Sequence, residues 1–114
     1  MLLTLLAFSV VGAATPPPAD TMAAFYSAAN RAAYVEALGY WAPETASTLK
    51  KGLKEFCNEQ TAGRTLERVE VLKQEVRGDR AEVRMELYFT SGLAVHTGSL
   101  VRQNGVWKIL YLGS

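Results

Sequence analysis

The sequence predicts an α+β domain, in which helices come first and a curved four-stranded antiparallel sheet follows and packs against them. Three observations lead to this prediction. Apolar residues recur at helical spacing in the first half of the chain. In the second half, apolar residues alternate with charged ones, which is typical of half-buried strands. The pair Asn104-Gly105 separates two such stretches and is a strong signal for a tight hairpin turn.

The first 14 residues are apolar, lack charged side chains and end in the small residues Gly12, Ala13 and Ala14. This stretch is too short for a membrane-spanning helix, which needs about 20 residues. Its small closing residues suit cleavage by signal peptidase near Ala13 or Ala14. We therefore expect residues 1–14 to be a secretion signal, with a buried first helix or a membrane anchor as alternatives. The expected location is secreted or periplasmic, and the cleaved protein is expected to have no membrane span.

Residues 15–19 are predicted to be an extended spacer, because they contain three consecutive prolines, and proline fixes φ and removes hydrogen-bond donors. Residues 20–114 then suffice for one domain with one core, but not for two. Cys57 is the only cysteine, so an internal disulfide is excluded. We expect Cys57 to act as a small buried apolar residue, and an intermolecular disulfide or a reactive thiol is the alternative.

Charge and motifs exclude several classes of function. The chain has 12 Lys and Arg against 11 Asp and Glu, and these charges are interspersed. This balance does not indicate binding to nucleic acid or anionic lipid. His96 is the only histidine and no metal-ligand spacing surrounds it, while Gly-rich phosphate loops and Cys-x-x-Cys pairs are absent from the sequence. The sequence therefore predicts no cofactor and no metal.

Three helices are expected before the sheet. Asp20 or Thr21 is predicted to cap a helix that runs to about Ala33. The second helical pattern has its apolar residues, Tyr34, Leu38 and Trp41, at i, i+4 and i+7; Gly39 interrupts it and Ala42-Pro43 stops it. The third helix begins at Pro43, which suits a first helical turn, and its apolar line consists of Ala46, Leu49, Leu53 and Phe56.

Four strands are expected at about 66–76, 80–90, 93–103 and 106–112. The first has apolar residues in two phases, which a β-bulge near Val71-Leu72 would reconcile. The second strand alternates, so its charged residues are expected to face solvent and its apolar residues to face inward; the apolar set is Ala81, Val83, Met85, Leu87 and Phe89. The sequence does not decide which side of the last two strands faces inward.

Four motifs resemble the nuclear transport factor 2-like superfamily, whose fold is also called cystatin-like. They are Phe25-Tyr26-x-Ala28-x-Asn30, Tyr34-x-x-Ala37, Trp41-x-Pro43-Glu44 and Asn104-Gly105-x-Trp107-Lys108-Ile109. Over residues 20–112 the chain is most similar to small secreted bacterial members of unknown function. The resemblance implies a cone in which a curved sheet wraps around helices, with a pocket at the wide end. It also implies homodimerisation through the sheet.

Aromatic residues, one methionine and one histidine are the candidates for lining such a pocket, where aromatic rings would stack on a flat apolar ligand. The alternative is that the same residues only fill a small core. The candidate set is Tyr26, Tyr34, Tyr40, Trp41, Met85, Phe89, His96, Trp107 and Tyr111.

Three hypotheses about function follow. The first is a noncatalytic domain that binds another protein or a second copy through the outer face of the sheet, with Tyr88, Val95, Val101 or Trp107 as an anchor. The second is binding of a small apolar or aromatic ligand in the pocket. The third is an isomerase or dehydratase-like enzyme that uses His96 or Glu36; the inward residues of strand 80–90 provide no carboxylate base for such chemistry.

Overall fold

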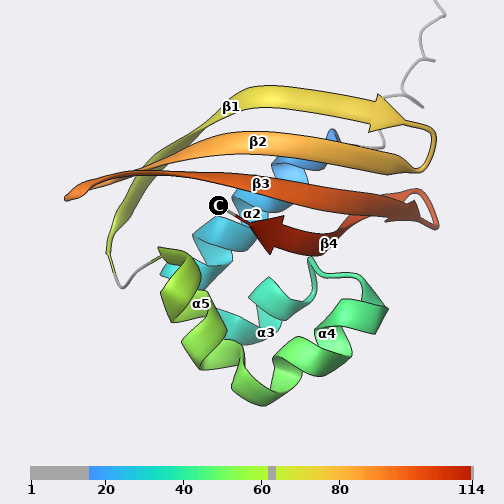
Figure 1. The fold of residues 1–114 in the computed structure, drawn as a ribbon. Coiled ribbons are helices and arrows are strands. Elements are labelled where there is room, and N and C mark those ends of the chain that lie inside the picture. Colours follow the sequence, from blue (N-terminus) through green and yellow to red (C-terminus); the bar gives the residue numbers. More distant parts are fainter. Residues whose placement is uncertain (1–15, 62–63, 114) are drawn as a thin grey trace, which may run out of the picture.

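Helices cover one side of a curved antiparallel sheet in this computed structural model, which describes residues 16–61 and 64–113 (Figure 1). The expected secretion signal lies outside the described residues. The helical segments are α2 (Pro18–Asn30), α3 (Tyr34–Leu38), α4 (Pro43–Leu49), the 3₁₀ turn η1 (Lys50–Gly52) and α5 (Leu53–Thr61). The strands are β1 (Leu66–Arg77), β2 (Arg80–Phe89), β3 (Gly92–Gln103) and β4 (Val106–Gly113).

The four strands form an antiparallel meander in the order β1-β2-β3-β4, which confirms the predicted fold class. The register of β1 against β2 shifts between Val71 and Lys73, where the sequence predicts a bulge. A second shift lies between Leu66 and Arg68. Asn104 and Gly105 have φ angles of 53° and 76°, so the predicted tight turn with two left-handed residues joins β3 to β4.

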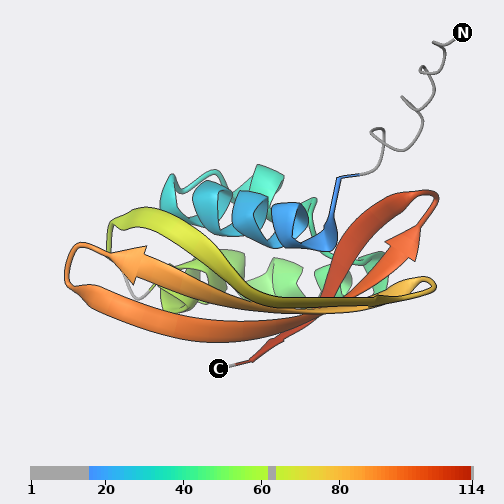
Figure 2. The ribbon, with the colours of Figure 1, turned by 90° about the horizontal axis from the view of Figure 1, so that it is seen from above.

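The sheet curls around α2, and Figure 2 shows the β3–β4 hairpin bending toward the first turn of that helix. The helix buries Met22 and Tyr26 against the inner face of the sheet, and its buried Phe25 ring contacts Trp41 and Phe56. From β2, the inner face buries all five residues of the predicted inward set. Strand β3 comes close to α2 at Gly98, where an added Cβ would lie 2.6 Å from Met22 Sδ. A side chain at position 98 would therefore displace the fully buried Met22 side chain.

The predicted helix boundaries need three corrections. Helix α2 begins at Pro18, and its N-cap residue Pro17 makes no side-chain capping bond, so the expected cap at Asp20 or Thr21 is wrong. A proline in the first turn lacks only an N–H that would have no partner inside the helix. The same helix ends at Asn30 because Ala32, with φ of 61°, cannot continue it. The third predicted helix is interrupted by η1 and becomes α4 and α5.

The segment that follows α3 covers part of the outer edge of β4. At β4, Ala42 N donates to Ile109 O and Ile109 N donates to Tyr40 O, so the segment after α3 pairs with the outer edge of this strand.

Cys57 on α5 is fully buried, as expected, and burial raises the pKa of its thiol. Among the described residues, no helix is long and apolar enough to cross a membrane.

Candidate functional site

A hydrogen-bonded tyrosine and histidine link α2 to the inner face of the sheet. The Tyr26 hydroxyl lies 2.6 Å from Nδ1 of His96, which faces inward because it is paired with Met85. Tyr26 is fully buried and His96 is half-buried. Burial raises the pKa of the Tyr26 hydroxyl and lowers the pKa of the His96 imidazole, so both groups are neutral near pH 7. One hydrogen bond joins the neutral pair, and the tautomer of the imidazole decides whether Tyr26 or His96 is its donor.

This pair lies in the packed interior. The tyrosine ring contacts Phe25, at 5.3 Å between ring centroids, and Phe25 contacts Trp41 edge-on at 5.5 Å. Met85 and Phe89 are buried in the same core. The three cavities described next are lined by other residues. Within the described residues, the Tyr26–His96 hydrogen bond thus has a structural role: it links α2 to β3, and we call it the polar tie.

The first cavity, of about 400 Å³, lies between the start of α2, the end of α3 and the β3–β4 hairpin. Trp107 and Tyr40 supply aromatic surface, and Lys108 Nζ donates to Gly39 O at 2.6 Å at the rim. Thr21 Oγ1 donates to Trp107 O at 3.3 Å, which ties the helix to the hairpin. Its size falls within the range of small-ligand sites. The remaining lining is Pro16, Asp20, Ala24, Gly105 and Val106.

A smaller cavity of about 210 Å³ lies near the end of α2 and is lined by Tyr34 together with mostly polar residues. Asn30 is one of its lining residues; its Nδ2 donates to Arg64 O at 2.6 Å and its Oδ1 accepts from Leu66 N. These bonds fix the chain at the start of β1. The polar lining makes this cavity unsuited to an apolar ligand.

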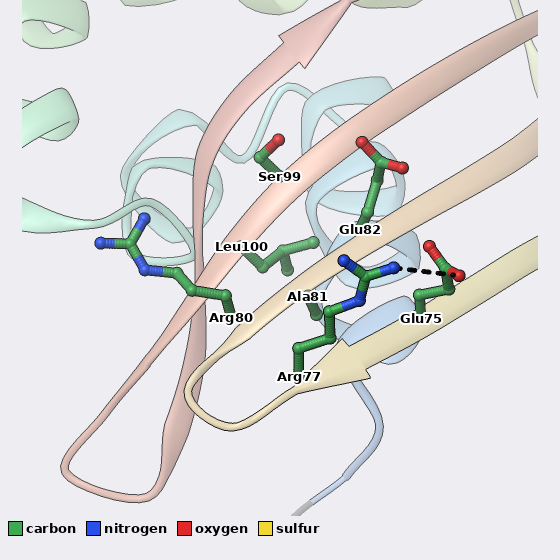
Figure 3. A pocket seen from close by; sticks show the side chains of 7 residues that line it. All are labelled: Glu75, Arg77, Arg80, Ala81, Glu82, Ser99 and Leu100. Atoms are coloured by element: carbon green, nitrogen blue, oxygen red, sulfur yellow. Dashed lines mark ion pairs between the residues drawn. The ribbon is translucent and has the colours of Figure 1, made fainter.

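Charged residues surround a hollow of about 270 Å³ where β1 turns into β2 (Figure 3). Arg77 Nη2 lies 3.7 Å from Glu75 Oε2, while Arg80 and Glu82 extend from β2. Two arginines and two glutamates give the hollow no net charge. It therefore has no evident preference for an anion or a cation.

The outer face of the sheet is divided into two halves. On β1 and β2 it carries charged side chains, among them Arg68, which forms an ion pair with Glu70 and lies 3.8 Å from the centre of the Tyr88 ring. On β3 and β4 it carries four apolar or aromatic side chains, with the uncharged polar residues Thr97 and Ser99 between them. We name this surface the apolar half after the four, which are Leu93, Val95, Val101 and Tyr111. Leu93 is 54% exposed and Tyr111 is 65% exposed, values that large apolar side chains reach where nothing covers them.

The nine predicted pocket residues therefore lie in four different places. Tyr26 and His96 bond to one another, and Trp41, Met85 and Phe89 belong to the core. Tyr40 and Trp107 share the largest described cavity, and Tyr34 lines the polar one. Tyr111 lies in the apolar half of the outer face.

Two further corrections concern the outer face. Trp107 was expected as one of its anchors, but this side chain points inward and is only 4% exposed. Leu93 was missed as an exposed residue. Strict alternation would have found it, because Leu93 shares its phase with Val95 and Val101 on a strand that pairs with β2 without a bulge.

Similar solved structures share this fold at low sequence identity. A protein described as an NTF2-like transpeptidase from Campylobacter jejuni has a TM-score of 0.70 and 13% identity, with 84% of this chain and 99% of that chain covered. A protein described as a calcium/calmodulin-dependent protein kinase type II association domain from Thiobacillus denitrificans has a TM-score of 0.68 and 13% identity over 86% and 93% of the two chains. A SEC-C motif protein from Rhodopseudomonas palustris has a TM-score of 0.65 and 14% identity over 78% and 71%.

No protein-family model and no curated protein matches the sequence. The structural matches nevertheless agree on the architecture. The chain has the nuclear transport factor 2-like fold, as the sequence motifs indicate.

Proposed function

We propose that this protein is a noncatalytic interaction domain that works in a secreted or periplasmic location and binds a protein partner through the apolar half of its outer sheet face. The observation that carries the proposal is the exposure of Leu93 and Tyr111 on the same outer face of β3 and β4, where the residues between them are uncharged. Large apolar and aromatic side chains act as anchors in protein interfaces, because burying them removes much apolar surface from water.

The contrast with the rest of that face supports this choice. The neighbouring strand β2 presents Arg80, Glu82, Arg84 and Glu86, which keep that half solvated. Charged residues are depleted at interface cores and persist at the rims. A partner would thus centre on β3 and β4, with the charged strands at the periphery.

The interior favours a noncatalytic role. The one histidine is tied to Tyr26 and is neutral, and Glu36, the other proposed catalytic group, lies on the surface. Arg31 donates to Glu36 at 2.9 Å and Tyr40 donates to it at 3.1 Å, and these bonds lower the pKa of its carboxyl. A general base for proton abstraction needs a pKa near the working pH, so these bonds act in the opposite direction.

Native mass spectrometry of the protein purified gently from the secreted and envelope fractions of its host tests this proposal. We expect a complex with a second protein chain, either a partner or another copy, and no bound small molecule. A monomer that retains a small-molecule mass would contradict the proposal.

A second candidate function rests on the cavity beside Trp107 and Tyr40. We propose as the alternative that it holds a small apolar or aromatic ligand, because about 400 Å³ suffices for one and two aromatic rings line it. Thermal stabilisation by hydrophobic compounds would support this function. The variant Ala24→Leu, which places a larger side chain in the cavity, should remove that stabilisation, whereas Ser27→Leu on the exposed side of α2 should not.

A further inference from the structure

One part of the sheet has an edge that no described element covers. Strand β3 pairs with β2 from Gly92 to Val101, but β4 pairs with it only from Thr97 onward. Figure 1 shows β3 continuing well past the arrowhead of β4. The five residues 92–96 are therefore paired on one side only within the described residues, and we call them the open edge.

The hydrogen-bond pattern identifies the main-chain groups that face outward there. Ile109 bonds through its own N and O to the 40–42 segment, so those groups face away from β3. Its partner Leu100 must then direct its N–H and C=O toward β2. Because these directions alternate along a strand that has no bulge against β2, the N–H and C=O groups of Leu93 and Val95 point to the open edge.

The other edges of the sheet are protected. The outer edge of β4 is paired with Tyr40–Ala42 at Ile109. The outer edge of β1 has two register shifts and many charged residues, two devices by which proteins prevent the addition of a further strand. Its charged residues are Glu67, Arg68, Glu70, Lys73, Glu75 and Arg77.

The open edge has neither device. Its sequence, Gly92-Leu93-Ala94-Val95-His96, contains no Asp, Glu, Lys, Arg or Pro, and the register against β2 is regular. The His96 imidazole is neutral through burial and is bonded to Tyr26, so it adds no charge. The open edge is therefore uncharged, regular and unpaired. Its free main-chain N–H and C=O groups can form hydrogen bonds with the main chain of an extended peptide.

We propose that the open edge of β3 binds an extended, uncharged segment of a partner protein, which adds to the sheet as a strand beside residues 92–96 and in line with β4. The inference deepens the proposed function and rests on it, since it names how the partner is held. The side chains of Leu93 and Val95 belong to the apolar half of the outer face, so the added strand would continue that surface. Apolar or β-branched residues are expected on the outward side of the bound segment.

The probe is a blocked peptide, Lys-Thr-Val-Thr-Val-Thr-Lys, whose five central residues represent the uncharged segment and whose terminal lysines only keep it in solution. The same peptide with proline in place of the central Thr is its matched control. Amide hydrogen exchange is followed by NMR on the protein. The first peptide should slow exchange at the Leu93 and Val95 amides about tenfold, because an added strand converts exposed donors into bonded ones. Amides on the outer edge of β1 should not change. The proline peptide should have no effect, since it lacks the central donor.

Two variants separate main-chain from side-chain contacts. Val95→Pro removes the N–H at the open edge and should weaken peptide binding about tenfold, while Val95→Ala keeps the N–H and should change it less than about threefold. Circular dichroism and thermal melting confirm that each variant is folded. If Val95→Pro misfolds, the exchange measurement on the unaltered protein decides the question.

Three results would overturn the proposal. One is unchanged exchange at Leu93 and Val95 at saturating peptide. Another is equal binding by Val95→Pro and the unaltered protein. The third is protection that rises with protein concentration without peptide, because that assigns the open edge to a second copy. None of these results would remove the proposed interaction through Val101 and Tyr111, which lie on the outer face away from the open edge.

Discussion

The two faces of strands β2 and β3 have opposite roles. The inner face is closed by α2, which approaches β3 at Gly98 and bonds to it through Tyr26 and His96. The outer face has no covering element among the described residues, and its β3–β4 half leaves Leu93 and Tyr111 exposed. From this difference we expect substitutions on the inner face to affect folding stability and substitutions on the outer face to affect binding.

The largest expected effect on stability is at the closest contact between helix and sheet. Gly98→Val should lower the free energy of unfolding by about 2 kcal/mol, because the new side chain would overlap Met22, which is fully buried and would have to repack in a filled core. Chemical denaturation measures the change. Gly52→Val is the matched control, since an added Cβ there would meet no atom within 4 Å outside its own stretch of chain, and it should cost much less. Equal effects of the two substitutions would break the comparison.

The next effect concerns the polar tie between α2 and β3. Tyr26→Phe should cost about 1 kcal/mol, because it removes the hydroxyl and leaves Nδ1 of His96 without its bonded partner. Tyr40→Phe is the control, since the Tyr40 hydroxyl bonds to Glu36 on the surface, where water replaces the lost contact. A Tyr26→Phe protein as stable as the unaltered one would show that the tie is dispensable.

The same tie predicts a dependence of stability on pH. The folded-state pKa of His96 is lowered by burial, so the unfolded chain takes up the proton first as the pH falls. Stability should be full above the ordinary histidine pKa of 6.5 and should decline as the pH falls through the lower folded-state value. Denaturation midpoints between pH 8 and pH 5, which are about the range in which histidine titrates, measure this decline. His96→Gln should flatten it, whereas an unchanged slope would assign it to other groups.

The smallest effect on stability is expected on the outer face. Tyr111→Lys should change the free energy of unfolding by less than about 0.5 kcal/mol, because the side chain is 65% exposed. The same variant should lose the protein partner, since it places a charge where an interface needs an apolar anchor. Arg84→Lys in the charged half should change neither property. A strongly destabilised Tyr111→Lys would mean that this residue belongs to the core.

Much of the sheet could be predicted because local patterns determine it. Strand β2 alternates without error, and the turn at Asn104-Gly105 requires two left-handed residues that only a few residue types adopt easily. The bulge near Val71 was predictable because two apolar phases meet there. Helix boundaries were less accurate, since the left-handed conformation of Ala32 has no sequence signal.

The site could be predicted only in part, because its residues come from distant segments. Tyr26 and His96 are 70 positions apart, and no local pattern pairs them. Strand β4 is apolar on both sides, and a register shift opposite Ser99 and Leu100 changes its phase after Ile109. That shift puts Trp107 on the inner face and Tyr111 on the outer face, although a regular strand would put both on the same side.

Site-specific photo-crosslinking in the host tests the central claim most directly. A photoreactive phenylalanine analogue is placed at position 111 or 101 in the apolar half and, for comparison, at position 84 in the charged half. We predict a discrete crosslinked protein partner or second copy at positions 111 and 101, and none at position 84. Crosslinks of equal strength at all three positions, or at position 84 alone, would contradict the assignment of the apolar half as the binding surface.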